Sequence, residues 1–433
     1  GIRDIGVTGV QTCALPILIE VYWNTKDFTQ LKSKIDKLKH IGYKKELVET
    51  YKEYGVNHEV EFDNKWWLIG FNNLVYDMQL REMREYRYED YISMTTGYDW
   101  REPTDEELET MTKLFEIIMP IPEEREAYLQ ILSSGLDGRC LEKFIVFNGK
   151  GGNGKGMIDD LILLALGDYG IIGNNGLLFE VSKTGSNPEK ANLHKKRFVL
   201  FREPPEKNKY ENSVVKELTG GGTFSARGLY ESSTSKELNS TTVVECNRRL
   251  LFKEEPGDAE IRRIIDILFR SSFVDDDKLV DYDNYIYKAN PLYKTKEFQE
   301  KHKYALMKIL MKYHSKIFEN QNNITLPESI IERTRKYLEL SCNIVEWFKD
   351  NYVIDNDEKQ FIPIADIYRD FKNSEFYSNL SKNDRAKYTK KYMVEYIENN
   401  IFFRKYYAER YNNSRNVVKG WNKKINDEVN EEP

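Results

Sequence analysis

Cysteine and proline are scarce in this chain. Among its 433 residues, 4 are cysteine and 12 are proline. The cysteines lie far apart, with no CxxC pair and no Cys/His cluster, which argues against both a disulfide framework and a zinc site. The low proline content, beside 29 tyrosines and 21 phenylalanines, argues against long disordered segments. We therefore expect folded domains in a reducing compartment and not a secreted protein.

The sequence also lacks a long apolar run and a strong net charge. No run approaches the ~20 residues that a membrane helix needs, so we expect no membrane partner. The net charge of -6 gives no general attraction to nucleic acid. Any DNA binding must therefore use local basic surfaces.

The first residues do not fit the rest of the chain. Residues 1–17 (GIRDIGVTGVQTCALPI) resemble a translated sequencing adapter and lack the basic start and cleavage site of a signal peptide. We expect this segment to be non-native and adapter-derived, and the original chain to have extended further in this direction.

Apolar strand-like runs alternate with helical segments in the middle of the chain. Such alternation predicts an α/β fold with a parallel sheet. Before it, residues 66–77 favour a hairpin, and residues 103–139 favour helices with Thr104 as a cap. After it, residues 327–421 read as helices followed by short strands. The predicted strands of the sheet are Phe144–Phe147, Arg197–Phe201, Thr241–Glu245 and Ile264–Phe269.

A glycine-rich loop follows the first of these strands and precedes an apolar helix. It matches G-x-x-x-x-G-K in the strand–loop–helix context of a P-loop, whose backbone N–H groups surround phosphates. Lys155 would reach the β- and γ-phosphates of ATP, and the bland alternative is an ordinary glycine-rich turn. The predicted nucleotide-binding residues are Gly149, Gly151, Gly152, Asn153, Gly154, Lys155 and Gly156.

Two later strands end in polar residues suited to phosphate chemistry. Glu203 follows an apolar strand, where a carboxylate can orient the attacking water or hold Mg²⁺, in part through water. Asn247 follows another strand and could bond the γ-phosphate or its water. Taken alone, each residue is more often an ordinary polar residue at a strand end, and its place in the order of motifs favours the phosphate role.

Two further patterns suggest contacts with a neighbouring subunit and with DNA. Arg262 and Arg263 precede a strand, where one of them could act as an arginine finger in a neighbour's site, although an Arg pair is often only a solvated face. Between the Glu203 and Asn247 strands, Arg227 and Lys236 could bind a DNA backbone and Tyr230 could stack on a base. A surface hairpin without a ligand is the alternative.

Together these motifs resemble a known family. The order NGKG, FVLFREPPE, KELTGGGTFSARGLYE, VVECN and IRRIIDILF is similar to superfamily 3 helicases of the AAA+ class. More closely, it resembles the poxvirus-type primase–helicases of large DNA viruses, with relatives in phages. The resemblance implies ATP and Mg²⁺ as cofactors, a homo-hexameric ring, single-stranded and forked DNA as partners, and a primase domain or protein nearby. It also implies Lys155 as phosphate-binding lysine, Glu203 as Walker B carboxylate, Asn247 as sensor, and Arg262 or Arg263 as finger.

The sequence departs from the family pattern at two glycines. Gly156 stands where Ser or Thr normally offers a hydroxyl to Mg²⁺, and Gly222 stands where the family often has Asp. We expect Gly156→Ser to raise Mg²⁺ affinity or turnover unless another group compensates. No primase carboxylate motif lies between Glu20 and Trp66, so priming chemistry is not expected here.

The sequence therefore predicts a P-loop AAA+ α/β core with flanking domains. The expected function is an ATP-hydrolysing DNA helicase motor of viral or phage replication, in the host cytoplasm or nucleus or in the bacterial cytoplasm. The alternatives are a catalytically degenerate P-loop ring protein that binds DNA, and another P-loop NTPase. The expected domains are an α+β and helical collar-like domain at 18–140, the helicase domain at 141–325 and a winged-helix-like DNA-binding domain at 326–433.

Overall fold

The computed structural model describes most of the chain after its first 35 residues. The described residues are 36–37, 40–55, 60–180, 187–220, 223–226, 234–320, 323–341, 343–355, 357, 359–380, 382–400 and 402–424. The chain falls into two units, Gly1–Phe62 and Asp63–Pro433. In the first unit the structure describes helix α3 (Ile41–Gly55), and the predicted adapter segment 1–17 lies outside the described residues.

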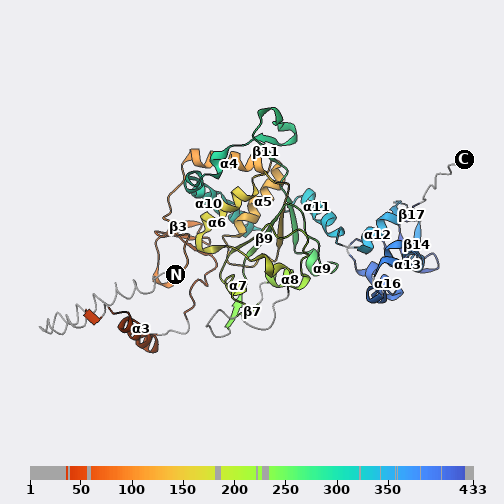
Figure 1. Cartoon of the computed structure of the whole chain (residues 1–433), viewed down its shortest axis with the longest axis horizontal. Helices are drawn as coiled ribbons and strands as arrows, with labels where there is room; N and C mark the ends of the chain where they lie inside the picture. The colour runs from red at the N-terminus through yellow and green to blue at the C-terminus, as the bar shows by residue number, and fades with distance from the viewer. Residues whose placement is uncertain are drawn as a thin grey trace. The chain divides into compact units, whose positions relative to one another are not determined.

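A five-stranded parallel sheet forms the centre of the second unit (Figure 1). Its strand order is β10-β4-β9-β6-β5, and every neighbouring pair is parallel. The predicted α/β class with a parallel sheet is thereby confirmed. Its strands are β4 (Phe144–Asn148), β5 (Gly170–Ile172), β6 (Phe198–Arg202), β9 (Thr241–Cys246) and β10 (Ile264–Leu268).

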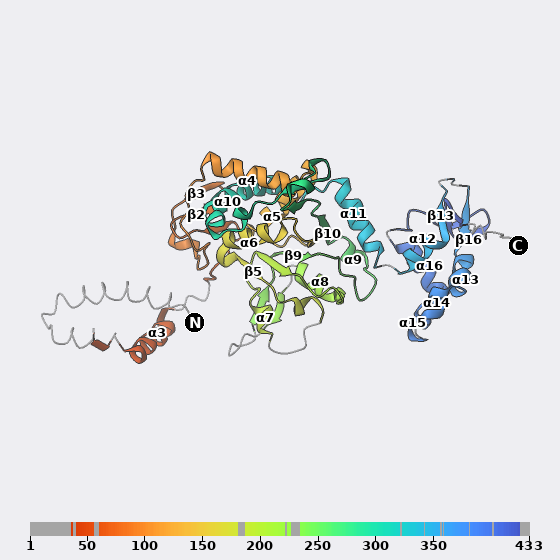
Figure 2. The same cartoon turned by 45° about the horizontal axis from the view of Figure 1, so that its top comes forward.

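Both faces of the sheet are covered, which explains why its strands are apolar throughout. Successive side chains of a strand point to opposite faces. Ile145 and Phe147 of β4 accordingly pack in one hydrophobic cluster, and Phe144 and Val146 pack in another. Figure 2 shows the two helical layers on either side of the strands. The first layer contains α4 (Asp105–Ile118), α5 (Pro122–Ser134), α6 (Lys155–Leu166) and α10 (Lys296–Glu319), and the second contains α7 (Pro188–Ala191), α8 (Asn212–Thr219) and α9 (Asp258–Ile261).

The segment before the sheet begins with a small antiparallel sheet. The hairpin predicted at 66–77 is present as β1 (Leu68–Gly70) and β2 (Val75–Asp77), with β3 (Glu82–Arg84) beside it. Thr104 caps α4 as predicted, because its side chain accepts the N–H of Glu107 and the Glu107 carboxylate accepts that of Thr104.

This preceding segment shares one core with the sheet. Phe71, Met111 and Leu132 belong to the same buried cluster as the sheet residues Phe147 and Ile267. Arg197, which is buried just before β6, donates to the carbonyl oxygens of Leu136 at 2.7 Å and Leu68 at 2.8 Å. The predicted boundary at residue 140 therefore lies inside a continuous hydrophobic core.

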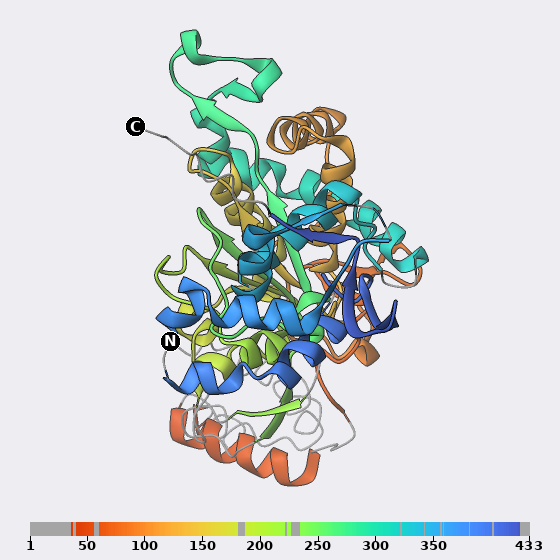
Figure 3. The same cartoon turned by 90° about the vertical axis from the view of Figure 1, so that its right-hand side faces the viewer.

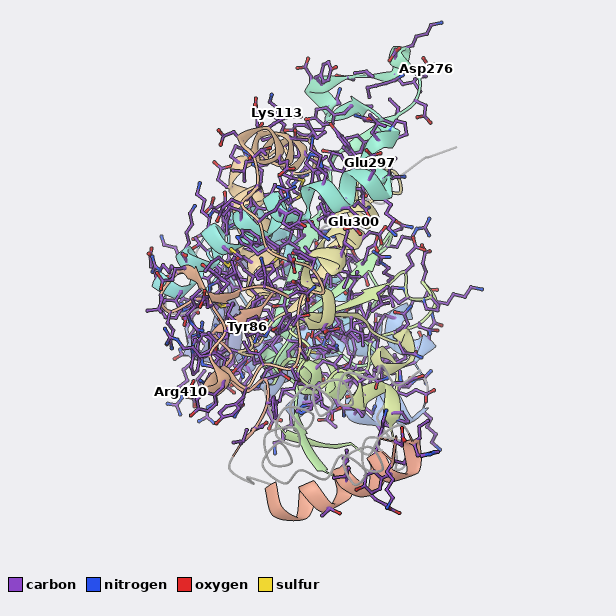
Figure 4. All side chains as sticks on the ribbon, turned by 90° about the vertical axis from the view of Figure 1, so that its left-hand side faces the viewer. Tyr86, Lys113, Asp276, Glu297, Glu300 and Arg410 are labelled. Atoms are coloured by element: carbon purple, nitrogen blue, oxygen red, sulfur yellow. The ribbon has the colours of Figure 1, made fainter. Side chains whose placement is uncertain are left out.

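An arm that the sequence pattern did not predict projects after β10. It contains β11 (Ser272–Val274) and β12 (Ile286–Lys288), which pair in parallel. Figure 3 shows this arm at the top of the molecule, and Figure 4 labels Asp276 near its end. At its base the N–H of Phe273 donates to the carbonyl oxygen of Gly152 at 2.8 Å, so the arm is fastened to the glycine-rich loop.

The C-terminal part has its own hydrophobic core. Helices α12 (Asn343–Asn351), α13 (Ile364–Lys372) and α16 (Lys390–Asn399) surround this core with a three-stranded antiparallel sheet. Helix α11 (Glu328–Glu339), which follows the predicted boundary at 326, packs on the central sheet, because its Tyr337 and Leu338 are buried in the second cluster. The remaining elements of this part are α14 (Glu375–Asn379), α15 (Lys382–Lys387), β13 (Tyr352–Ile354), β14 (Phe361–Pro363), β15 (Tyr407–Tyr411), β16 (Ser414–Lys419) and β17 (Trp421–Lys423).

Candidate nucleotide-binding site

The glycine-rich loop joins the carboxyl end of β4 to the start of α6. Gly149 has a φ of 149°, and a Cβ there would lie 2.6 Å from the carbonyl oxygen of Phe269. Gly154 has a φ of 87°, and a Cβ there would lie 3.0 Å from Ile118. No larger residue fits either position without strain. The loop therefore has the close backbone turn that phosphate binding requires, placed at a helix N-terminus.

Lys155 is buried under this loop. Its Nζ donates to the carbonyl oxygen of Gly149 at 2.7 Å and lies 3.4 Å from Oδ1 of Asn247. Burial lowers the pKa of Lys155, and the neighbouring acidic groups oppose this effect. The structure thus brings together Lys155 and Asn247, which lie far apart in the sequence. A phosphate group could replace the Gly149 carbonyl as the partner of the Lys155 ammonium.

Asn153 is also buried in the loop. Its Oδ1 accepts the N–H of Lys155 at 3.3 Å, whereas its Nδ2 has no hydrogen-bond partner among the described residues. A buried donor without a partner is costly, so this amide is available to a phosphate oxygen. Gly151 and Gly152 lie at the exposed side of the same loop, and open space surrounds a Cβ built at Gly151.

Glu203 stands at the carboxyl end of β6, on the same edge of the sheet. Its side chain is exposed, and its N–H donates to the carbonyl oxygen of Glu245 at 2.9 Å. Its φ of 43° lies in the left-handed region, which is unfavourable for glutamate. Such backbone strain is common in functional sites, so the outlier agrees with a site at this strand end.

A carboxyl pair that sequence reasoning missed lies behind the loop. Glu245, on the central strand β9, and Asp159, on α6, are 7% and 0% exposed. Burial, followed by the charge of Glu245, raises the pKa of Asp159 well above its usual range, and burial also raises the pKa of Glu245. The burial of two neighbouring carboxyl groups therefore favours their protonated forms.

One basic group from the neighbouring strand approaches this pair. Nε of Arg202 lies 3.7 Å from Oε2 of Glu245, and its Nη2 is 2.6 Å from Asp160. The sequence did contain a signal for the pair, because Glu245 interrupts the buried strand TTVVEC and Asp159 interrupts the apolar helix KGMIDDLILLAL. A charged residue at a buried position often marks a functional site.

Arg262 and Arg263 lie at the opposite edge of the sheet, before β10. Arg262 is exposed at the end of α9, and no ion pair of the described residues involves its side chain. Arg263 is buried, and its Nη1 donates to the carbonyl oxygen of Ala259 at 2.7 Å. The two arginines therefore have different surroundings, and neither is gathered with Lys155.

The predicted DNA-binding residues are only partly described. Arg227 and Tyr230 lie outside the described residues, and of Lys236 the structure describes the backbone. Lys236 belongs to β8 (Thr234–Glu237), which pairs with β7 (Thr223–Ala226) as an antiparallel hairpin. The predicted roles of these three residues stay predictions.

The described part of the chain contains no group of three or more His, Cys, Asp or Glu side chains arranged to hold a metal ion. It also contains no helix with the length and apolar character needed to cross a bilayer.

Fold and loop define the class of this protein: an α/β P-loop domain with a helical segment before its sheet and a smaller body after it. Residues 9–120 match the family described as "D5 N terminal like", a match that begins inside the predicted adapter segment. The chain is 28% identical over 332 residues to "Putative helicase L207/L206" of Acanthamoeba polyphaga mimivirus, which is 74% of this chain and 34% of that protein. It is 27% identical over 275 residues to "Primase D5" of Fowlpox virus (strain NVSL), which is 59% of this chain and 34% of that protein.

These matches agree with the predicted resemblance to replication proteins of large DNA viruses, among them a putative helicase and a D5 primase. The chain spans about a third of the length of these two relatives, 34% in each case. Among solved structures, an apo form of the NrS-1 C-terminal region aligns with 74% of this chain and 77% of its own, at 14% identity and a TM-score of 0.40.

Proposed function

We propose that this chain is the ATP-hydrolysing motor of a DNA helicase that serves viral or phage replication. The observation that carries the proposal is the placement of Lys155, whose ammonium lies between the glycine-rich loop and Asn247 at the carboxyl edge of a parallel sheet. In P-loop enzymes this lysine stabilises the charge on the β- and γ-phosphates. The name of the mimivirus relative, a putative helicase, supports the use of ATP hydrolysis for helicase activity.

The residues of the site divide the work of hydrolysis. The loop Gly149–Gly156 binds the phosphates, with Gly149, Gly152 and Gly154 providing the backbone turn. Glu203 orients the attacking water and assists in holding Mg²⁺, and Asn247 senses the γ-phosphate. Mg²⁺ supplies charge neutralisation on the phosphates when it is bound.

We further propose that the active form is a homo-hexameric ring with ATP sites between subunits. An arginine at the amino edge of the sheet is far from its own phosphate site and suits a neighbour's site in a head-to-tail ring. Of the two candidates, Arg262 is the exposed one and Arg263 is already held by Ala259. We therefore assign the finger to Arg262 and a structural role to Arg263.

The C-terminal body would add a contact to the DNA backbone. Arg410 of β15 and Arg415 of β16 are exposed and directly opposite each other in the antiparallel pair. Like charges at such positions destabilise a sheet, so their presence favours an anionic partner. Figure 4 labels Arg410. We propose that single-stranded and forked DNA are the partners, and that a primase domain or protein acts beside this chain in the host cytoplasm or nucleus, or in the bacterial cytoplasm.

Phosphate release with and without single-stranded DNA tests the proposal. A helicase motor should hydrolyse ATP, and DNA should stimulate it, whereas Lys155→Ala should be inactive. Gly156 supports a second candidate, a ring protein that binds DNA without hydrolysis. DNA binding without any phosphate release would favour this candidate, and DNA-independent hydrolysis would favour another kind of P-loop NTPase.

A further inference from the structure

Gly156 is the position at which this P-loop lacks its expected hydroxyl. The residue is the second of α6, directly after Lys155. A Cβ built there would have one neighbouring heavy atom within 4 Å, Oε1 of Glu245, at 3.8 Å. A serine or threonine side chain here would therefore have that carboxylate as its neighbour. The glycine thus leaves space beside a carboxylate oxygen at the place where a metal-binding oxygen is missing.

Glu245 is held firmly in this position by the sheet. It is the fifth residue of the central strand β9, where it pairs with Phe147 of β4 and Arg202 of β6. Its backbone carbonyl also accepts the N–H of Glu203, which connects it to the predicted Walker B position. The carboxylate therefore belongs to the same strand ends as Lys155, Glu203 and Asn247.

Asp159 provides an independent sign that a cation belongs here. It lies three residues after Gly156 on α6, which places it on the same side of the helix. The side chain is 0% exposed, no N–H or hydroxyl group of the described residues donates to its carboxylate, and the polar side chain beside it is the carboxyl group of Glu245. Burying two neighbouring carboxyl groups without a donor or a cation beside them is unfavourable, and a bound cation would offset that cost.

We propose that Glu245 provides the Mg²⁺-binding oxygen that the P-loop hydroxyl provides in other P-loop proteins, with Asp159 as a positioning carboxylate behind it. The inference rests on the proposed function, because the metal would arrive with ATP. Mg²⁺ in such sites is held by one or two carboxylates together with phosphate oxygens and water, so no protein cage of three acids is required. Gly156 then belongs to a compensated site, because the oxygen that the loop lacks comes from Glu245.

The test compares Mg²⁺ dependence of nucleotide binding in wild type and variants. A fluorescent ATP analogue is titrated in EDTA and at a series of Mg²⁺ concentrations, so that no turnover is needed. Glu245→Gln should bind the analogue in EDTA as wild type does. The Mg²⁺ midpoint, which is the Mg²⁺ concentration that gives half of the Mg²⁺-dependent change in binding, should rise by about tenfold or more. Adding Gly156→Ser to Glu245→Gln should restore much of the midpoint, because the hydroxyl returns. Gly156→Ser alone should lower the midpoint by less than it does in the Glu245→Gln background.

Matched variants separate the oxygen ligand from other effects. The double variant Gly156→Ala with Glu245→Gln adds a β-carbon at position 156 without a hydroxyl, and it should not restore the midpoint. Glu206→Gln removes an exposed carboxylate after β6 and should behave as wild type. Asp159→Asn should shift the midpoint in the same direction as Glu245→Gln, but less, and it serves as the second variant if Glu245→Gln folds poorly.

The outcomes distinguish this inference from the proposed function. An unchanged Mg²⁺ midpoint in both Glu245→Gln and Asp159→Asn overturns the inference, while nucleotide binding itself still stands. Equal rescue by Gly156→Ala and Gly156→Ser overturns it as well, because the hydroxyl would then be irrelevant. If the wild type binds no nucleotide, or Lys155→Ala binds it equally well, the proposed function fails instead.

Discussion

Arg262 should act on the ATP of a neighbouring subunit, and the register of the sheet gives the reason. Ile264 pairs with Phe144 and Leu268 pairs with Asn148, so Arg262 lies seven residue positions before Gly149 along the strand direction. At about 3.3 Å per residue, the two are separated by roughly 20 Å. An arginine side chain cannot cover that distance, so the residue cannot serve its own glycine-rich loop.

The expected effect of Arg262→Ala is a loss of hydrolysis with nucleotide binding retained. An arginine finger accelerates phosphoryl transfer by about a thousandfold or more. Mixing Arg262→Ala with Lys155→Ala subunits should restore activity, because some interfaces then pair an intact loop with an intact arginine. In rings assembled at random from equal amounts, about a quarter of the interfaces have this composition.

The assay is phosphate release by the mixture, with native mass spectrometry to verify that mixed rings form. Arg335→Ala, at an exposed arginine of α11, is the matched control and should remain active. Arg263→Ala should instead lower the free energy of unfolding by about 1–3 kcal/mol, since it removes a buried donor to Ala259. Full activity of Arg262→Ala as an isolated subunit, or mixed rings without any recovery, would refute the reasoning.

Three further predictions concern the loop, the C-terminal body and the helix cap. Lys155→Ala should weaken ATP binding by about 10- to 100-fold, as expected for a lost charge-assisted hydrogen bond. Lys150→Ala, at an exposed lysine of the same loop, should not weaken it. Calorimetry with ATP would measure both variants, and equal ATP affinities of the two would contradict the assignment of Lys155. Deleting residues 343–433, after α11, should lower DNA affinity at low salt by about tenfold, and the difference in affinity should decrease as salt is added. If a fluorescence anisotropy titration shows no loss of affinity, the basic side chains of the C-terminal body, such as Arg410 and Arg415, are only solvated surface residues. Arg101 donates hydrogen bonds to the Glu107 carboxylate, and this lowers the pKa of Glu107. The ionised carboxylate therefore stabilises the fold above the ordinary pKa of 4.5, and this stabilisation is lost as the pH falls through the lowered pKa. Glu107→Gln should therefore lower the free energy of unfolding by about 1 kcal/mol at pH 7 and by much less at pH 3, as measured in urea; a difference independent of pH would argue against the ion pair.

Local signals in the sequence were sufficient for much of the fold. The strand before Gly149, the hairpin at 66–77 and the Thr104 cap each follow from patterns that a few neighbouring residues determine. The arm with β11 and β12 was not predicted, because its strands have three residues each and pair in parallel across an irregular segment. Short strands of this kind have no periodicity that a sequence can display.

Residues of the candidate site were predictable where a sequence motif stands at the end of a predicted strand. Lys155 and Asn247 follow from strand ends in a parallel sheet, and the structure brings them together. Glu245 and Asp159 were missed because each by itself is only a charged residue in an apolar element, and their pairing depends on a contact between β9 and α6 that the sequence pattern does not specify. The sequence also could not separate Arg262 from Arg263, since adjacent residues differ here only in burial.

Arg197 has a practical consequence for dividing this chain into fragments. Its guanidinium holds one carbonyl group from β1 and one from the turn after α5, both of which precede the sheet. A recombinant fragment that starts at residue 141 would leave this cation buried without its acceptors and would uncover the apolar face that α4 and α5 protect. Such a fragment should aggregate on expression, whereas one that starts at Asp63 should remain in solution.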